Sequence, residues 1–167
     1  SNLLNNATRI YGCLKDSLGQ PLVNQHFNVA VLSKANNLRL VEDVKKGSTS
    51  IKIYGGYRYF LEGRKLLVME KEKYAFIEVE IFDTEQDCFR LNQAISSGFK
   101  TGATLYYSWQ LETNKKGEFL LPIPLTLINE DKTIKLKFFI GPNVINEELK
   151  VKLGDSNRLN VKMIKEG

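Results

Sequence analysis

The sequence predicts a mainly all-β fold, an antiparallel β-sandwich with one short inserted helix. Three observations support this prediction. Apolar residues recur at every second position in many runs, which is the periodicity of half-buried strands. Clusters of Gly, Pro, Asn and Asp separate these runs at intervals of about 8 to 15 residues, as in sandwiches and barrels. Hydrophobic residues make up 43% of the 167 residues, which is enough for a core.

The alternating runs cover much of the chain. We expect strands at 27–31, 77–81, 105–111, 119–127, 134–140, 149–153 and 159–163. In one such run, Ile134, Leu136 and Phe138 share a face while Lys135 and Lys137 lie opposite. Because short turns separate the runs, consecutive strands should pair antiparallel.

The opening stretch "YGCLKDSLGQPL" predicts a tight turn between two apolar runs. Gly19 readily adopts a positive φ, Pro21 fixes its φ at about −65°, and Asp16 can bind the backbone that follows it.

One stretch departs from the period of two. Cys88, Leu91 and Ile95 lie at i, i+3 and i+7, after a capping-type start at Asp83 and before Gly98. This spacing predicts a short helix near 84–97.

Pro122 and Pro124 lie two residues apart in an apolar run. Both lack an N–H on the same side of a strand, so this strand should lie at a sheet edge or at a break in pairing.

We expect a single β-sandwich domain over 8–165. Residues 1–7 are interpreted as a tag remnant and disordered N-terminus, because "SNLLNN" looks like a cloning scar. No secretory signal is visible, and a leader removed from the sequence stays an open alternative.

The opening stretch also resembles a known family. Its first part is carried by Ile10, Gly12, Leu14, Asp16, Gly19, Pro21 and Leu22, followed by Phe27 and Val29. These residues resemble the pattern G-x-V-x-D-x-x-G-x-P-L that opens a carboxypeptidase-regulatory-like (transthyretin-like) β-sandwich. Thr113, "NKKG" and Phe119 are similar to the second part of that signature.

The resemblance implies a sandwich of transthyretin-like or immunoglobulin-like type. It also implies an accessory or adhesive module, since such domains usually lack a conserved catalytic site. In the family the two parts lie close in sequence, whereas here residues 32–112 intervene. We therefore treat 32–112 as a candidate insert that carries the predicted helix.

Composition excludes several classes of site. Cys13 and Cys88 are too few for a disulfide framework or a zinc site, although one bridge between them stays open. His26 is the sole histidine and is read as a strand residue. Because no run of about 18 apolar residues occurs, we expect no membrane span. No phosphate-binding loop, dinucleotide motif or nucleophile elbow is present, so we expect no cofactor and no metal.

The stretch "IYGGYRYFLEGRK" is the main candidate for ligand binding. Aromatic rings interleaved with arginine can stack on sugars or on unstacked bases. The candidate residues are Tyr54, Tyr57, Tyr59, Arg58 and Arg64. The alternative is a β-hairpin, in which Tyr57, Tyr59 and Leu61 share a half-buried face.

Lysines on the last strands form a second candidate. A formal net charge of +5 and a pI of about 9.1 permit attraction to an anionic partner. Lys135, Lys137, Lys150 and Lys152 would make a basic sheet face for an anionic polymer. The alternative is that they serve solubility on an outer face.

Two sets of carboxylates complete the candidates. Asp83, Glu85 and Asp87 have the one-three-five spacing of a calcium loop, but Cys88 stands where that loop has Gly, so acidic residues at a helix N-terminus are favoured. Glu78 and Glu80 lie on one strand face and could act together in glycoside hydrolysis, although a solvated face is the simpler interpretation.

The expected function is that of a non-catalytic binding or structural module of a secreted, surface or multi-subunit bacterial or phage assembly. Its partner would be a protein or a carbohydrate rather than nucleic acid. The alternatives are a carbohydrate-active hydrolytic domain using Glu78 and Glu80, and anionic-polymer binding through the lysine face. The expected location is extracellular or at the cell surface, with cytoplasmic or virion-associated locations left open.

Overall fold

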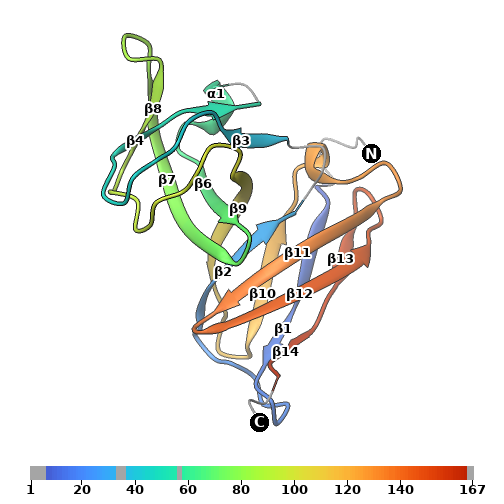
Figure 1. Cartoon of the computed structure of the whole chain (residues 1–167). Helices are drawn as coiled ribbons and strands as arrows, with labels where there is room; N and C mark the ends of the chain where they lie inside the picture. Colours follow the sequence, from blue (N-terminus) through green and yellow to red (C-terminus); the bar gives the residue numbers. More distant parts are fainter. Residues whose placement is uncertain (1–6, 33–36, 56–57, 165–167) are drawn as a thin grey trace. The chain divides into compact units, whose positions relative to one another are not determined.

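The computed structural model describes residues 7–32, 37–55 and 58–164, apart from the side chains of Arg58 and Tyr59 (Figure 1). The fold is all-β, with about 53% strand and 3% helix and a large antiparallel sheet. No helix among the described residues is long and apolar enough to span a membrane. The chain divides into two compact units, one formed by 1–35 with 110–167 and the other by 36–109.

The first unit contains two groups of paired strands. In one group, β1 (Arg9–Lys15) pairs antiparallel with β10 (Glu118–Pro122) and parallel with β13 (Ser156–Arg158) and β14 (Val161–Lys162). The other group has the order β12 (Asn143–Lys150), β11 (Thr133–Ile140), β2 (His26–Val31) and β9 (Thr104–Glu112), of which residues 110–112 belong to this unit.

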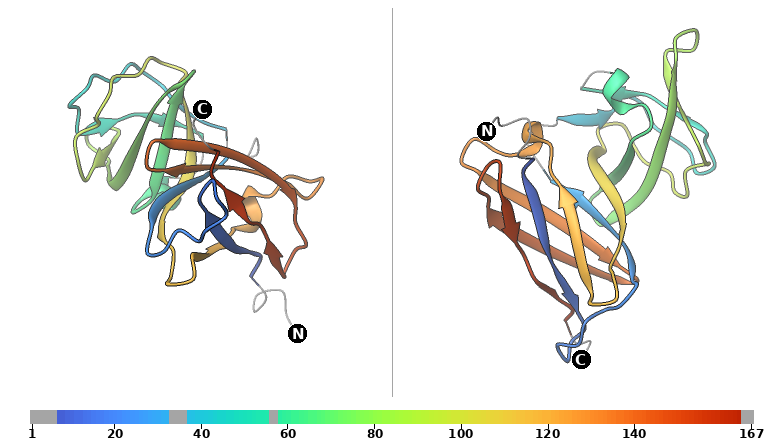
Figure 2. Two further views of the ribbon diagram at one scale, coloured as in Figure 1. Left: turned by 90° about the horizontal axis from the view of Figure 1, so that it is seen from below. Right: turned by 180° about the vertical axis from the view of Figure 1, so that it is seen from behind.

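Three phenylalanines form the centre of the first unit. Phe27 of β2 lies 5.8 Å from Phe119 of β10 and 6.1 Å from Phe138 of β11, between ring centroids. Phe119 and Phe138 are also 5.8 Å apart in an edge-to-face arrangement. These contacts join the two strand groups through one apolar interior, built from the alternating residues of the sequence. Figure 2 shows the strands of both groups from two further sides.

The second unit is built from shorter strands. They are β3 (Leu38–Leu40), β4 (Ser50–Ile51), β5 (Ile53–Tyr54), β6 (Lys65–Glu70), β7 (Lys73–Asp83) and β8 (Cys88–Leu91), joined by residues 104–109 of β9. Pairing runs β9-β6-β7-β8-β4, and β4 continues through Lys52 into β5. Because β5 pairs with β3 and β3 pairs with β9, the pairing closes into a ring. Its core includes Leu66, Val68, Val79 and Leu105.

The predicted helix near 84–97 is wrong. Residues 84–87 form a turn, and Cys88–Leu91 form the strand β8, which pairs with β7 and β4. Phe89 and Leu91 are buried on one face, with Arg90 exposed between them. This alternation has period two, but it covers only four residues, too few to outweigh the i, i+3, i+7 pattern in the sequence.

Four strand predictions need correction. In β7 the pairing with β8 shifts register between Val79 and Ile81, so Ile81 is 49% exposed and leaves the face of Ile77 and Val79. The run at 119–127 stops at Pro122, and Leu125–Leu127 form the 3-10 helix η2. The last two runs are also displaced, because β12 already begins at Asn143 and two short strands, β13 and β14, follow it.

The opening turn agrees with its prediction. The Asp16 Oδ1 atom accepts hydrogen bonds from the N–H groups of Leu18 at 2.9 Å and Gln20 at 2.8 Å, and Gly19 has a φ of 84°. Beyond the turn, Pro21 bridges to Lys15. The edge position expected from the prolines also agrees, because β10 lies at the end of its sheet, with Pro124 beyond its last residue.

The second unit lies inside 32–112, the stretch that the sequence analysis treats as a candidate insert. Residues 1–6, to which most of the predicted tag remnant belongs, lie outside the described residues. Cys13 and Cys88, for which a disulfide stayed open, are both free thiols.

Candidate functional site

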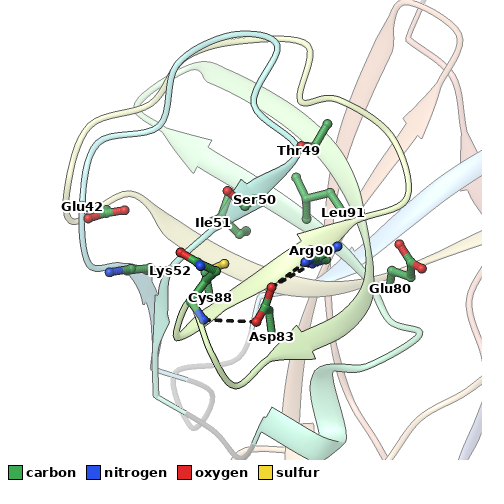
Figure 3. A pocket seen from close by; sticks show the side chains of 11 residues that line it. Glu42, Thr49, Ser50, Ile51, Lys52, Glu80, Asp83, Cys88, Arg90 and Leu91 are labelled. Carbon is green, nitrogen blue, oxygen red and sulfur yellow. Dashed lines mark hydrogen bonds and ion pairs between the residues drawn. The ribbon is translucent and has the colours of Figure 1, made fainter.

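A polar hollow of about 520 Å³ on the second unit is the main candidate site (Figure 3). It is lined from β4, from the β7–β8 hairpin and from the loop after β3. The polar residues around it are Glu42, Thr49, Ser50, Lys52, Glu80, Asp83, Gln86, Cys88 and Arg90. A second hollow, of about 370 Å³, shares Glu42, Ser50, Ile51 and Lys52 with it. Both hollows are therefore lined by β4 and by Lys52, which follows it.

The β7–β8 hairpin holds Asp83 in place. Its Oδ2 atom accepts hydrogen bonds from Arg90 Nε at 3.0 Å and Nη2 at 2.7 Å. Its Oδ1 atom accepts from the N–H groups of Glu85 and Gln86, which form the turn at the hairpin tip. The hydrogen bond from Arg90, followed by that from the Gln86 backbone, keeps the pKa of Asp83 below its usual value.

The arginine in this pair is positioned but still accessible. Its side chain is 61% exposed, whereas that of Asp83 is 11% exposed. The hydrogen bond with Asp83 raises the pKa of Arg90, and Glu80 adds a weaker attraction of the same sign. A guanidinium fixed at one edge by a carboxylate can present its remaining N–H groups to a ligand.

The charges along the hollow alternate in sign. Figure 3 shows Glu42 and Lys52 at one end and Glu80 at the other, with Asp83 and Arg90 between them. Glu80 reaches the hollow from the β-bulge of β7, where the register with β8 shifts. Bulges re-aim side chains and are frequent beside binding sites. The arrangement can offer hydrogen-bond donors and acceptors to a polar ligand from several directions.

Of the predicted aromatic site, the structure describes the side chains of Tyr54 and Arg64, which have different partners. Tyr54 is exposed on β5, with the guanidinium of Arg39 4.6 Å from its ring centre. Arg64 lies 5.4 Å from the ring centre of Tyr107 instead, and its Nε donates to the Phe60 carbonyl. Burial raises the pKa of Tyr107, and Arg64 partly offsets this.

The alternative prediction, a β-hairpin with Tyr57, Tyr59 and Leu61 on one face, is wrong. Residues Arg58–Leu61 form the single helical turn α1, and Leu61 is buried in the core of the second unit. Tyr57 lies outside the described residues, as do the side chains of Arg58 and Tyr59.

The lysines of the predicted basic face are exposed or half-buried on β11 and β12, but acidic residues interrupt them. Lys135 lies opposite Glu148 in the strand register, and Lys150 lies opposite Thr133. Lys152 follows β12 and lies 3.8 Å from Asp155. Lys137 lies opposite Asn146, so three of the four predicted lysines have an acidic or hydroxyl neighbour.

The two carboxylate sets are placed differently from each other. Asp83 belongs to the hairpin just described, and Glu85 and Asp87 lie exposed in its turn. Glu80 lines the hollow, whereas Glu78 precedes the bulge, opposite Lys65 of β6. Among the described residues, no group of three or more His, Cys, Asp or Glu is placed to hold a metal ion.

Sequence reasoning missed Glu42, Lys52 and Arg90 as parts of one hollow. They come from three segments that only the closed pairing of the ring brings together. The acidic-basic pair Asp83 and Arg90 is the one local signal that could have been read, once residues 83–90 are recognised as a hairpin.

The two stretches that resemble the family pattern, 10–29 and 113–119, contact each other in the first unit. Thr113 is buried, and its hydroxyl donates to the Leu22 carbonyl at 2.6 Å while accepting the Gln25 N–H at 2.8 Å. The Leu14 N–H donates to the Gly117 carbonyl at 2.9 Å. Residues about 90 positions apart in the chain therefore form one structural cluster.

Comparison with known proteins gives no family assignment: no protein-family model and no curated protein matches this chain.

Proposed function

We propose that this chain is a non-catalytic binding module, a sandwich of transthyretin-like type whose inserted second unit carries the binding site. The observation that carries the proposal is the contact of Thr113 with Leu22 and Gln25. It joins the two parts of the signature, as expected if the intervening stretch is an insert. The buried hydroxyl satisfies one donor and one acceptor of the loop before β2, which is a specific structural role.

The polar hollow of the second unit supports the binding half of the proposal. Its volume lies in the range of ligand sites, although its lining is more polar than usual. Hydroxyl, amide, carboxylate and guanidinium groups suit a ligand rich in hydroxyls, so we assign it a carbohydrate rather than nucleic acid. Such a module fits the expected secreted or surface-exposed assembly.

The hydrolytic alternative has less support. A glycosidase needs a general acid with a raised pKa beside a second carboxylate. In the hollow, Arg90 lowers the pKa of Asp83. Of the two carboxylates, Glu80 lines the hollow and Glu78 does not. Binding of an anionic polymer through the lysine face is likewise weakened, because Glu148 lies beside Lys135.

A glycan array probed with the whole chain tests the proposal. We expect binding of at least one glycan that falls about tenfold or more in Lys52→Ala and in Glu80→Gln, because both side chains line the hollow. Lys46→Ala is the matched control, since this lysine is exposed on the same unit and does not line either hollow. An array without signal, or an equal loss in Lys46→Ala, contradicts the proposal.

Two further measurements separate the alternatives. If the chain releases an aryl leaving group from chromogenic glycosides, and Glu80→Gln abolishes this release, the assigned function becomes hydrolysis instead of binding. A heparin column with a salt gradient tests the lysine face, and we expect Lys135→Ala to change the eluting salt concentration only slightly. A large shift toward lower salt would favour the anionic-polymer alternative.

A further inference from the structure

The strand β12 has an open edge in the first unit. It lies at the end of its sheet and pairs on one side with β11, in an unbroken register from Thr133↔Lys150 to Ile140↔Asn143. The two-residue turn at 141–142 makes Ile140 and Asn143 the first hydrogen-bonded pair. The alternation of hydrogen-bonded residues along β12 continues to Val151, whose N–H donates to the Lys132 carbonyl at 2.8 Å.

The alternation fixes which backbone groups face outward. Residues 145, 147 and 149 bond to β11, so the N–H and C=O groups of Val144, Asn146, Glu148 and Lys150 point to the open edge. No pairing of this edge with another strand occurs within the described ranges. Such a row of donors and acceptors is a template for a further strand.

Among the described residues, the other strand edges are short or interrupted, whereas this one is not. β10 ends at Pro122, and β13 and β14 are two or three residues long. At β4 the Ser48 hydroxyl donates to the Ser50 carbonyl and accepts its N–H. β12 has eight residues without proline, bulge or positive φ. Its open edge therefore has the properties of an association site.

The ends of the edge limit how a second strand can bind. At one end lies the turn at 141–142. At the other, the Asn157 side chain accepts the Lys152 N–H and donates to the Lys152 carbonyl. Residues 143–151 lie between these two stops, because the ladder with β11 continues to Val151. An antiparallel copy of the same stretch therefore overlaps it completely when residue 147 faces residue 147.

We propose that β12 pairs antiparallel through this edge with β12 of a second copy of the chain, with Glu147 on the two-fold axis. Complete overlap between the two stops requires this register. It places Asn146 opposite Glu148 and Val144 opposite Lys150 of the second copy, each as a hydrogen-bonded pair.

The side chains are complementary on both faces in this register. On the inner face, Ile145 lies opposite Leu149 of the second copy, which extends the apolar row that Phe138 and Ile145 already form. On the outer face, Asn146 meets Glu148, whose own neighbour on β11 is Lys135. Lys135, Glu148 and Asn146 of the second copy then form one row across the strands, so that the carboxylate lies between an ammonium and an amide group.

One pair opposes the association. The two Glu147 side chains face each other across the axis, and each is only half exposed. Like charges directly opposite each other weaken a strand pair. Removing this repulsion should therefore strengthen the dimer, which a contact through any other surface would not predict.

Sedimentation velocity of the full chain over a wide concentration range tests the proposal. We expect the mean mass to rise toward twice that of the monomer. Glu147→Gln should tighten the association about tenfold, and Glu147→Lys should leave it weak on its own. An equal mixture of Glu147→Lys with the unmodified chain should associate more tightly than either alone, because Lys then faces Glu across the axis.

Asn146→Pro tests the edge itself, since its outward N–H is not used by β11. We expect it to abolish association, whereas the matched control Asn146→Ala keeps the N–H and should change association less than about threefold. Far-ultraviolet dichroism checks that both variants fold. If Asn146→Pro does not fold, the Glu147 series still decides. A chain that stays monomeric at every concentration, or an association unchanged by the Glu147 variants, overturns the proposal.

Discussion

Gly12 lies where two segments of the first unit cross. A Cβ atom at this position would overlap the carbonyl oxygen of Leu159, part of the link between β13 and β14. This link is held to β1 by the Leu159 N–H, which donates to the Tyr11 carbonyl at 2.8 Å, and by the Asn160 side chain, which accepts the Cys13 N–H. The glycine of the signature is thus required by a close backbone approach.

We predict that Gly12→Ala lowers the free energy of unfolding by about 3 kcal/mol or prevents folding, because the obstacle is backbone that cannot move aside easily. Gly19→Ala is the control: its Cβ would meet no atom within 4 Å, and only its positive φ costs about 1 kcal/mol. Urea unfolding measures both. Equal losses in the two variants would show that the crossing at Leu159 does not restrict residue 12.

At the scale of elements, Thr113 connects the loop before β2 to the turn between β9 and β10. Its hydroxyl both donates to Leu22 and accepts from Gln25, and the side chain is 2% exposed. The following turn is held by Asn114, whose Oδ1 accepts the N–H groups of Lys116 and Glu118. The loop before β2 and the turn between β9 and β10 therefore depend on one buried hydroxyl.

We predict that Thr113→Val lowers the free energy of unfolding by about 2 kcal/mol, because it leaves a partly buried N–H and a partly buried carbonyl without this partner. Thr113→Ser keeps the hydroxyl and loses one methyl group, at a cost of about 1 kcal/mol. Thermal unfolding of the three proteins checks the order. If valine is tolerated as well as serine, the hydrogen bonds do not stabilise this junction.

The elements also show what the sequence could predict. Long alternating runs, such as Ile134 to Ile140, specify their strand because one face is buried throughout. Short elements were misread: β8 has four residues, and its partner strands come from 50–51 and 79–83, which the local pattern does not contain. η2 follows Pro124, where Leu125 and Leu127 still alternate although the strand has ended. Pairing decides such cases, and it is a property of the fold.

At the scale of the whole molecule, the candidate site was less predictable than the fold. The hollow depends on the closure of the ring, which joins Glu42, Lys52 and Arg90 from separate segments. Aromatic and lysine patterns drew attention to residues near in sequence, but Tyr54 and Arg64 have different partners in the structure. Sites assembled from several segments leave weak local signals, since each segment contributes only one or two side chains.

The two units differ in how their carboxylates respond to acid. In the second unit, the pKa values of Asp43, Glu70 and Asp83 are lowered, chiefly by hydrogen bonds from the Thr101 backbone, the Lys100 backbone and the Arg90 side chain, in that order. In the first unit, a hydrogen bond from the Thr133 side chain lowers the pKa of Asp131, while burial raises that of Glu147.

A lowered and a raised carboxyl pKa change the free energy of unfolding with pH in opposite directions. A carboxylate with a lowered pKa stabilises the fold above its unfolded pKa of about 4, and this contribution is lost as the pH falls through the lower folded value. A carboxyl with a raised pKa gains stability on protonation and loses it as the pH rises through the folded value. Acid should therefore weaken the second unit, with three lowered values, more than the first, where one lowered and one raised value oppose each other.

We predict that a change from pH 6 to pH 2.5 lowers the melting temperature of the second unit more than that of the first. The melting temperature of each unit is the temperature at which its amide resonances lose their native positions. Two-dimensional NMR of the whole chain during heating measures this. Asp83→Asn should reduce the acid sensitivity of the second unit, because asparagine has no proton to bind, and the exposed Asp87→Asn is the matched control on the same hairpin. Both units melting together at every pH, or a first unit that weakens before the second, would contradict the opposing signs, since Asp43, Glu70 and Asp83, whose pKa values hydrogen bonds lower, all lie in the second unit.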